Sequence, residues 1–245
     1  MLPVEDCLAA ITAHTRGLAA AAEGNLDARV EHCPDWSVGD LVWHLASVHW
    51  FWENVARLRP STAPEDLERP GRPADEDLVA TLLTNMSQLV DTLRASDQNA
   101  ACWTWGLEEN IGFITRHQVQ EAAVHHWDAV NATRSGSWEM DPAVAADAVD
   151  EFLTHSVANR RWPEKDAAPL GGTIAFDPWR ISDGAQPGTL THEGSGSGSD
   201  VITGRGTASD FLLWLYRRID DPCSLQPWHG DSTLLERFRA FTNTD

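Results

Sequence analysis

Apolar residues recur every three or four positions through most of the first 160 residues, which is the spacing of amphipathic α-helices. A segment rich in proline and arginine at 60–73 interrupts this pattern and predicts a loop. The N-terminal part of the chain is therefore expected to consist of helices. The stretches that keep the helical period predict five of them, at about 4–23, 37–59, 75–95, 111–133 and 142–162.

Two of these helices have recognisable start signals. The run from Ser37 to Asp40 is a capping box, in which the serine side chain accepts from the Asp40 amide and the Asp40 side chain reaches back. Asp141 is a good cap residue, and Pro142 after it suits a first helical turn, where no amide proton is needed. We therefore expect the second and fifth helices to begin at these points.

Beyond residue 163 the pattern changes to short apolar runs between glycine, proline, serine and aspartate residues. Such runs are typical of short strands joined by turns. The glycine-serine run at 194–199 lies between two of them and predicts a hairpin loop. The candidate strands lie at 171–176, 189–192 and 200–203.

Two helical signals follow these strands. A second capping box at 207–210 predicts a helix over 211–218, and Asp231 caps a last helix, with a short strand expected between the two. Strands mixed with helices in this order are typical of an α+β domain. The sequence thus predicts an N-terminal four-helix bundle within 1–163 and a smaller C-terminal α+β domain at 164–245, a mixed α plus α/β fold.

The net charge narrows the class of partner. The 245 residues carry 37 acidic and 18 basic side chains, which gives a formal net charge of −19. Nucleic acids and anionic membrane surfaces bind proteins through lysine and arginine, so this charge argues against both partners. A small-molecule substrate is the expected partner, and the sequence leaves monomer and homodimer open.

The compartment is predicted from the N-terminus and the cysteines. The first residues are acidic and interrupted, unlike the basic and then apolar start of a signal peptide, and no run is apolar enough for a membrane span. The four cysteines show no C-x-x-C pair, which suits reduced thiols. We therefore expect a cytoplasmic protein. The cysteines are Cys7, Cys33, Cys102 and Cys223.

A polar stripe in the fourth predicted helix is the first candidate site. Glu121 and His125 are four residues apart, so their side chains lie one turn apart on one face, and Gln118 and Asp128 extend that face. Such a stripe is either the solvent-facing side of the helix or an internal site. Apolar residues on the neighbouring faces leave little room for a simple solvent side.

A histidine in the second predicted helix strengthens the case for an internal site. His44 lies among the inward apolar positions, where a lone histidine is often a hydrogen-bonded core residue. Facing Glu121 and His125, however, it would complete three ligands suited to zinc or another divalent metal, with a fourth position open for water or substrate. His14 and His117 remain open as further ligands, whereas His49 and His126 point to other faces.

The residues around these ligands resemble those of a known family. The run from Trp36 to Ala46 resembles the W-[ST]-x-x-D-L-x-x-H-L-A signature of the mycothiol-dependent maleylpyruvate isomerase family, and the run from Glu121 to Ala129 resembles its E-x-x-x-H-R-W-D-A signature. The runs at 206–216 and 230–238 resemble its second domain. These runs follow one another in the order of the family and span nearly the whole chain.

The resemblance implies both a fold and a set of residue roles. The fold is a DinB-like four-helix bundle followed by a smaller α+β domain, and the implied zinc ligands are His44, Glu121 and His125. The catalytic arginine of the family falls on Arg218. Arg217 stands where many relatives have glycine, so either arginine could face the site, and a helix end that favours cations is the alternative reading of both.

The resemblance also implies a zinc-dependent enzyme that uses mycothiol as a thiol cofactor or co-substrate. In the first hypothesis the activated thiol adds to an electrophilic double bond and promotes cis–trans isomerisation, as with maleylpyruvate. In the second the same thiol stays attached to an electrophilic metabolite or xenobiotic, which makes the protein an S-transferase. A non-catalytic metal-binding module is the third hypothesis, and nothing in the sequence separates the first two.

Overall fold

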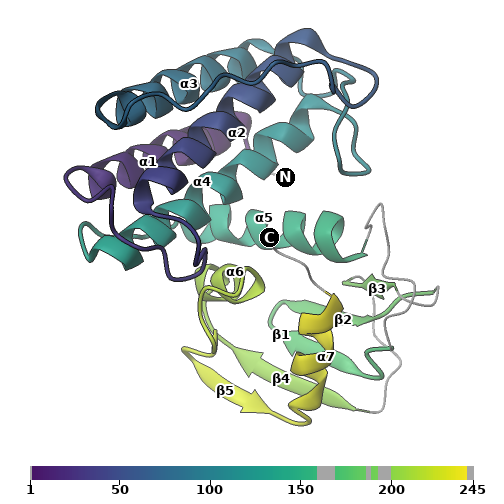
Figure 1. Cartoon of the computed structure of the whole chain (residues 1–245). Coiled ribbons are helices and arrows are strands. Elements are labelled where there is room, and N and C mark those ends of the chain that lie inside the picture. Colours follow the sequence, from purple (N-terminus) through teal and green to yellow (C-terminus); the bar gives the residue numbers. More distant parts are fainter. Residues whose placement is uncertain (1, 159–168, 186–188, 193–199, 242–245) are drawn as a thin grey trace. The chain divides into compact units, whose positions relative to one another are not determined.

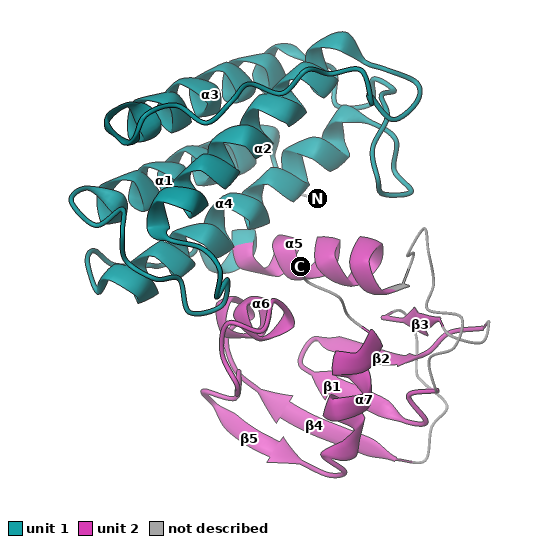
Figure 2. Cartoon of the chain, in the orientation of Figure 1, with its two compact units in different colours: residues 1–144 teal, residues 145–245 magenta. Residues whose placement is uncertain are grey.

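The computed structural model of the chain describes residues 2–158, 169–185, 189–192 and 200–241. The chain divides into two compact units, residues 1–144 and residues 145–245 (Figure 2). The helix that begins at Pro142 crosses this division. The predicted domain boundary at 163/164 and the predicted hairpin loop at 194–199 both lie outside the described residues.

The first unit is a bundle of helices (Figure 1). Helix α2 packs against α3, and helix α1 packs against α4. Further contacts join α1 to α3 and α2 to α4. This arrangement confirms the predicted four-helix bundle. Its members are α1 (Val4–Ala22), α2 (Val38–Leu58), α3 (Asp75–Ala95) and α4 (Ile111–Thr133).

Local hydrogen bonds set the first residues of α2 and α4. In the Ser37 capping box, the Asp40 amide donates to Ser37 Oγ at 3.2 Å, and the Ser37 amide donates to Asp40 Oδ2 at 2.9 Å. Asn110 caps α4 by accepting from the Phe113 amide at 2.9 Å. Each such cap contributes about 1 kcal/mol and fixes where the helix starts. The two helices that carry the candidate ligands therefore have defined registers.

The core of the bundle is the apolar stripe that the sequence pattern predicts. Leu41 and Leu45 of α2 and Leu78 and Leu82 of α3 are completely buried. Burying each such leucine contributes about 1.5–3 kcal/mol relative to leaving it exposed. This apolar seam holds α2 against its neighbours.

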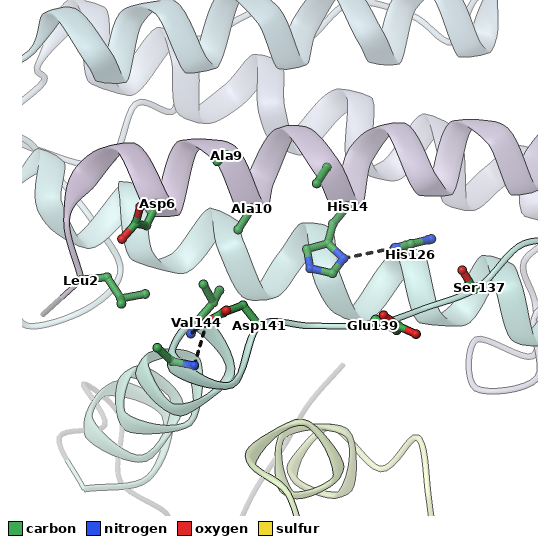
Figure 3. Close-up of a pocket in the computed structure, with 12 residues that line it drawn as sticks. Leu2, Asp6, Ala9, Ala10, His14, His126, Ser137, Glu139, Asp141 and Val144 are labelled. Atoms are coloured by element: carbon green, nitrogen blue, oxygen red, sulfur yellow. Dashed lines mark hydrogen bonds between the residues drawn. The ribbon is translucent and has the colours of Figure 1, made fainter.

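The contact between α1 and α4 depends on a glycine. A Cβ atom added to Gly17 would overlap the imidazole ring of His126. That ring is buried, and its Nδ1 lies 3.1 Å from Nδ1 of His14 in a hydrogen-bonded pair. The two rings line a pocket of about 610 Å³ at the side of α1, where Figure 3 shows His14 and His126 joined by their hydrogen bond.

Three histidines inside the bundle are held in the neutral form. Burial lowers the pKa of His14 and that of His126 to about 4. Burial also lowers the pKa of His49 to about 4, although its hydrogen bond with Gln118 opposes the shift. His49 lies 2.9 Å from Gln118 Oε1 and 3.1 Å from Thr15 Oγ1, so both ring nitrogens have partners.

The second unit is a sheet with helices. The strand order is β3-β2-β1-β4-β5, in which β1 pairs with β4 in parallel and the other neighbours are antiparallel. This unit confirms the predicted α+β class. Its elements are α5 (Pro142–Phe152), the π-helix η1 (Leu153–Ala158), β1 (Thr173–Phe176), β2 (Trp179–Asp183), β3 (Leu190–Thr191), β4 (Val201–Arg205), α6 (Ala208–Leu215), β5 (Gln226–His229) and α7 (Thr233–Phe241).

Aromatic stacking holds α6 and α7 in this unit. Phe176 of β1 stacks on Phe211 of α6 with ring centroids 4.2 Å apart, and Phe211 stacks on Trp214. Trp214 in turn stacks on Phe238 of α7 at 5.6 Å. Buried aromatic rings provide large contact areas, so this series of rings links the sheet to both helices. The predicted capping box at Thr207 is present at the start of α6.

Two elements differ from the predictions. The fifth helix keeps α-helical geometry only to Phe152 and continues as the π-helix η1 to Ala158, whereas the rest of its predicted length, 159–162, lies outside the described residues. Strand β2 follows β1 after a tight turn, where no separate strand was predicted. Strand β5 lies between α6 and α7, where the sequence predicts a short strand. In the described part of the chain, no helix combines the length and apolarity that a membrane span requires.

We predict that Gly17→Ala destabilises the protein by about 1–2 kcal/mol, because the clash with the His126 ring outweighs the gain in helix propensity. Gly71→Ala is the matched control, since a Cβ there meets nothing within 4 Å, and it should change stability by no more than about 0.5 kcal/mol. Urea unfolding of both variants measures the difference. Equal stabilities would show that α1 and α4 have room for the methyl group.

The neutral histidines predict a loss of stability in mild acid. Their pKa values are about 4 when folded and 6.5 when unfolded, so unfolding binds protons in this interval. Their contribution to stability is complete above pH 6.5 and is lost as the pH falls towards 4, at up to about 1.4 kcal/mol per pH unit for each histidine. Calorimetric unfolding at pH 5.5 should show uptake of about three protons. No uptake would contradict this account.

Candidate metal centre

Helices α2 and α4 bring the three predicted ligands together. Glu121 Oε2 lies 3.5 Å from His125 Nε2 and 3.9 Å from His44 Nε2. One ligand atom from each of the three side chains lies within 4.8 Å of the others. The spacing of four residues on α4 places Glu121 and His125 on one face, and α2 supplies His44 from the opposite side.

These distances fit a divalent metal. Zinc binds histidine nitrogen and carboxylate oxygen at about 2.0–2.2 Å, which places the ligand atoms of a tetrahedral site about 3.3 Å apart. The observed separations of 3.5 and 3.9 Å need only small side-chain movements to reach that value. Two imidazoles and one carboxylate also form a donor set that zinc accepts in catalytic sites. The residues therefore fit the ion that the sequence analysis predicts.

The centre is open on one side. The His44 side chain is 34% exposed and that of Glu121 is 23% exposed, whereas that of His125 is only 11% exposed. An ion held by the three groups would thus be reached from the exposed edge near His44. That accessibility is typical of catalytic rather than structural sites, where four protein ligands enclose the metal.

The electrostatics of the centre favour a charged pair. Burial alone would raise the pKa of Glu121, but hydrogen bonds from His117, His125 and His44 lower it well below its ordinary value. For His125, burial opposes protonation, yet the hydrogen bonds with Asp128 and Glu121 raise its pKa to about 9. A metal ion that binds here must displace the proton of His125. Glu121 is already ionised, so it can bind the ion without losing a proton.

Asp128 supports His125 from behind. Its Oδ2 lies 3.0 Å from His125 Nδ1, and its side chain is fully buried one turn further along α4. A carboxylate on Nδ1 fixes the orientation and tautomer of the ring, which leaves Nε2 to face a metal. In the sequence, Asp128 extends the polar stripe of Glu121 and His125, where no role was predicted for it. Its spacing of three residues from His125 is the signal that could have indicated this contact.

His117 is a second residue whose role was left open. Its Nε2 lies 3.4 Å from Glu121 Oε1, the oxygen that does not face His44 and His125. The ring is buried and stacks on Phe113 at 5.5 Å with an interplanar angle of 9°. His117, Glu121 and His125 therefore form one row on α4 with a spacing of four residues.

An aromatic residue from the loop before α2 covers the centre. The Trp36 ring lies 4.8 Å from the His44 ring and 6.4 Å from the His125 ring. The two histidine rings meet edge to face at 4.9 Å. Trp36 begins the motif that carries the family resemblance, and here it forms an apolar wall beside two of the candidate ligands.

The other histidines of the bundle have different partners. His14 and His126 pair with each other, and His49 is bonded to Thr15 and Gln118. The sequence predicts that His49 and His126 point away from the three candidate ligands, and these contacts agree with that prediction. His14 belongs to the pair at the side of α1 and is not grouped with the candidate ligands.

The two candidate arginines lie at the end of α6, in the second unit. Arg217 has a left-handed backbone with φ of 61°, and the amides of Arg217 and Arg218 donate back to Trp214 and Leu213. This is the Schellman pattern, in which glycine is the usual residue at the left-handed position. Arg217 therefore occupies a position where glycine would fit without backbone strain.

The side chains of the two arginines differ in their surroundings. Arg217 Nη2 donates to the carbonyl of Arg239 in α7 at 2.7 Å. Arg218 is buried, and its Nη1 donates to the carbonyl of Tyr216 at 2.7 Å. Tyr216 itself packs its ring on Phe152 at 4.9 Å. Both arginines lie in a different unit from the three candidate ligands, so their catalytic roles stay predictions.

Comparisons with known proteins place this arrangement in a family. The sequence model of the mycothiol maleylpyruvate isomerase N-terminal domain matches residues 7–130. No curated protein matches the sequence significantly. The fold resembles a crystal structure of the mycothiol-dependent maleylpyruvate isomerase, with 15% identity, a TM-score of 0.57 and coverage of 94% of both chains. A mutant of the enzyme of that name matches at 13% identity and a TM-score of 0.60, over 89% of this chain and 90% of that one.

The two structural matches show a shared fold and no more than that, because their sequence identities are too low to indicate a shared function. The family match rests on the sequence itself and includes both helices that hold the candidate ligands. It covers half of the chain, from Cys7 in α1 to Val130 in α4, so this protein belongs to the mycothiol-dependent maleylpyruvate isomerase family.

Proposed function

We propose that this protein is a zinc-dependent enzyme that uses mycothiol to attack an electrophilic small molecule, with cis–trans isomerisation as its reaction. The observation that carries the proposal is the convergence of His44, Glu121 and His125 on one point with an open side. Family membership supplies the thiol and the reaction class. The names of the similar structures, both maleylpyruvate isomerases, support the same choice.

The three ligands would hold zinc, which keeps a bound thiol in its thiolate form at neutral pH. Asp128 would hold the His125 ring through Nδ1, so that Nε2 keeps its lone pair directed at the centre. The thiol and the substrate would reach the centre through the partly exposed edge near His44. Trp36 would shield one side of the bound thiol from water.

The reaction itself needs no net oxidation. His44, Glu121 and His125 would hold the zinc, and the thiol would supply a nucleophile for one carbon of a cis double bond conjugated to a carbonyl. The carbon–sulfur bond made in this way would break again after rotation about the former double bond, so that the trans isomer leaves and the thiol is regenerated.

An anionic substrate would need a local cation, because the overall charge of −19 repels it. We propose Arg218 for this role, in which a guanidinium holds a carboxylate through two parallel hydrogen bonds. Both arginine side chains donate to carbonyl groups within their own unit. The left-handed backbone of Arg217 suits glycine, and this feature favours Arg218 over Arg217.

Thiol transfer is the second candidate reaction. The Trp36 wall beside His44 and His125 would suit a bulky apolar electrophile better than a small dicarboxylate. In that case the carbon–sulfur bond formed in the first step persists, and a proton quenches the adduct. The same ligands would serve both reactions, so product analysis separates the two candidates.

We predict that purified protein contains one zinc ion per chain and that His125→Ala contains almost none, because three ligands are the minimum for a stable site. Elemental analysis measures the metal, and calorimetric titration with mycothiol measures thiol binding. Thiol binding should disappear together with the metal.

His229→Ala is the matched control, because His229 is an exposed histidine on β5 in the other unit. It should keep both the metal and the thiol affinity of the wild type. Wild-type protein without stoichiometric metal, even after zinc is added back, would contradict the proposal and favour a non-catalytic binding module on the same fold.

We predict that Arg218→Lys lowers kcat/KM for mycothiol-dependent isomerisation of maleylpyruvate by roughly 10- to 100-fold, because lysine cannot form the two-pronged contact. Arg217→Gly should keep the activity and increase stability by about 1 kcal/mol, since glycine relieves the left-handed backbone. Steady-state kinetics and urea unfolding test both variants. An equal loss of activity in Arg217→Gly would reverse the assignment.

A further inference from the structure

The two ring nitrogens of His117 have different partners. Its Nδ1 lies 3.3 Å from the side-chain Nε2 of Gln120. With the Gln120 amide in this orientation its NH₂ group can only donate, which assigns Nδ1 of the imidazole as the acceptor. In the neutral ring the proton is then on Nε2, which faces Glu121 Oε1 at 3.4 Å. His117 is thus a hydrogen-bond donor to the carboxylate.

The two oxygens of Glu121 are consequently not equivalent. Oε2 faces the other two candidate ligands, His125 and His44. Among the three imidazoles around Glu121, Oε1 faces only that of His117, through its donor nitrogen. A metal ion drawn to the centre would therefore meet one oxygen of Glu121 that is available and one that is already engaged.

We infer that His117 is a positioning residue, an inference that rests on the zinc centre proposed above. It holds Glu121 Oε1, so that Glu121 binds the metal through Oε2 alone. A carboxylate with both oxygens free can bind through two bonds, which would crowd the fourth position. That position is the one a catalytic centre keeps for its thiol or substrate. His117 would thus keep the site four-coordinate and open.

The surroundings of His117 suit this role. Its ring stacks on Phe113 and meets the Trp105 ring edge to face at 5.0 Å, so its orientation is fixed by packing. The ring is buried and cannot turn towards solvent. Direct coordination by His117 would require a lone pair on Nε2, which the donated hydrogen bond of Gln120 to Nδ1 disfavours.

Two variants separate the hydrogen bond from the packing. His117→Gln keeps a donor, because the amide nitrogen of glutamine reaches about as far as the imidazole Nε2. His117→Phe keeps a flat ring against Phe113 but has no donor. Circular dichroism and urea unfolding establish that both variants are folded before any metal measurement.

The probe is cobalt(II), loaded in place of zinc, because four-coordinate cobalt absorbs visible light several times more strongly than five-coordinate cobalt. Wild type and His117→Gln should both give the strong four-coordinate spectrum. His117→Phe should give the weak five-coordinate spectrum. Its affinity for added mycothiol, followed by the sulfur-to-cobalt charge-transfer band, should fall by roughly 10-fold or more, in line with other groups that orient metal ligands.

Each other outcome overturns the inference. Three identical cobalt spectra would show that Glu121 binds in the same way without His117. An equal change in both variants would show that the imidazole itself is needed, as a ligand or through packing. Wild-type protein that takes up no cobalt would overturn the metal centre and the role of His117 together, whereas normal uptake with unchanged spectra would overturn only the role of His117.

Discussion

Glu121 is an ionised carboxylate inside a helical bundle, where an isolated charge is costly unless neighbouring groups compensate for it. The compensation comes from three imidazoles, two of which lie on the same helix one turn before and one turn after it. Because His117, Glu121 and His125 follow one another at intervals of four residues, the helix itself places them in a row. Helix α2 then has to contribute only His44. The candidate metal centre, its open side and the supporting contact of Asp128 all depend on this row.

The position of His44 depends on where α2 begins. The capping box of Ser37 and Asp40 lies about two turns before it, and a shift of one residue would rotate every side chain of the helix by about 100°. Such a shift would also turn Leu41 and Leu45 out of the core, in which both are completely buried. The apolar seam and the ligand are therefore set by the same register. A bundle that packs well in this way necessarily presents His44 to α4.

Most of the bundle and the grouping of the three candidate ligands could be predicted from the sequence, because periodicity and capping boxes are local signals. The spacing between Glu121 and His125 is also local, and His44 could be joined to them because inward positions on facing helices meet. Strand β2 and the π-helix η1 could not be predicted, since β2 offers only two alternating apolar positions and η1 continues the helical spacing of α5. The role of His117 depends on which of its nitrogens carries the proton. The contact with Gln120 decides the position of this proton, and the spacing of residues along the sequence does not reveal that contact.

The fold leaves the choice of substrate to the side chains around the open position. At 13–15% identity the similar structures show the architecture and do not define these side chains. Trp36 makes one wall of the centre apolar, and the net charge of −19 repels an anion from the molecule as a whole. A carboxylate substrate can then be accepted only if an arginine overcomes that repulsion locally, which is the role we propose for Arg218. The choice between isomerising an acid and modifying an apolar electrophile therefore depends on whether the local charge or the apolar wall dominates at the open position.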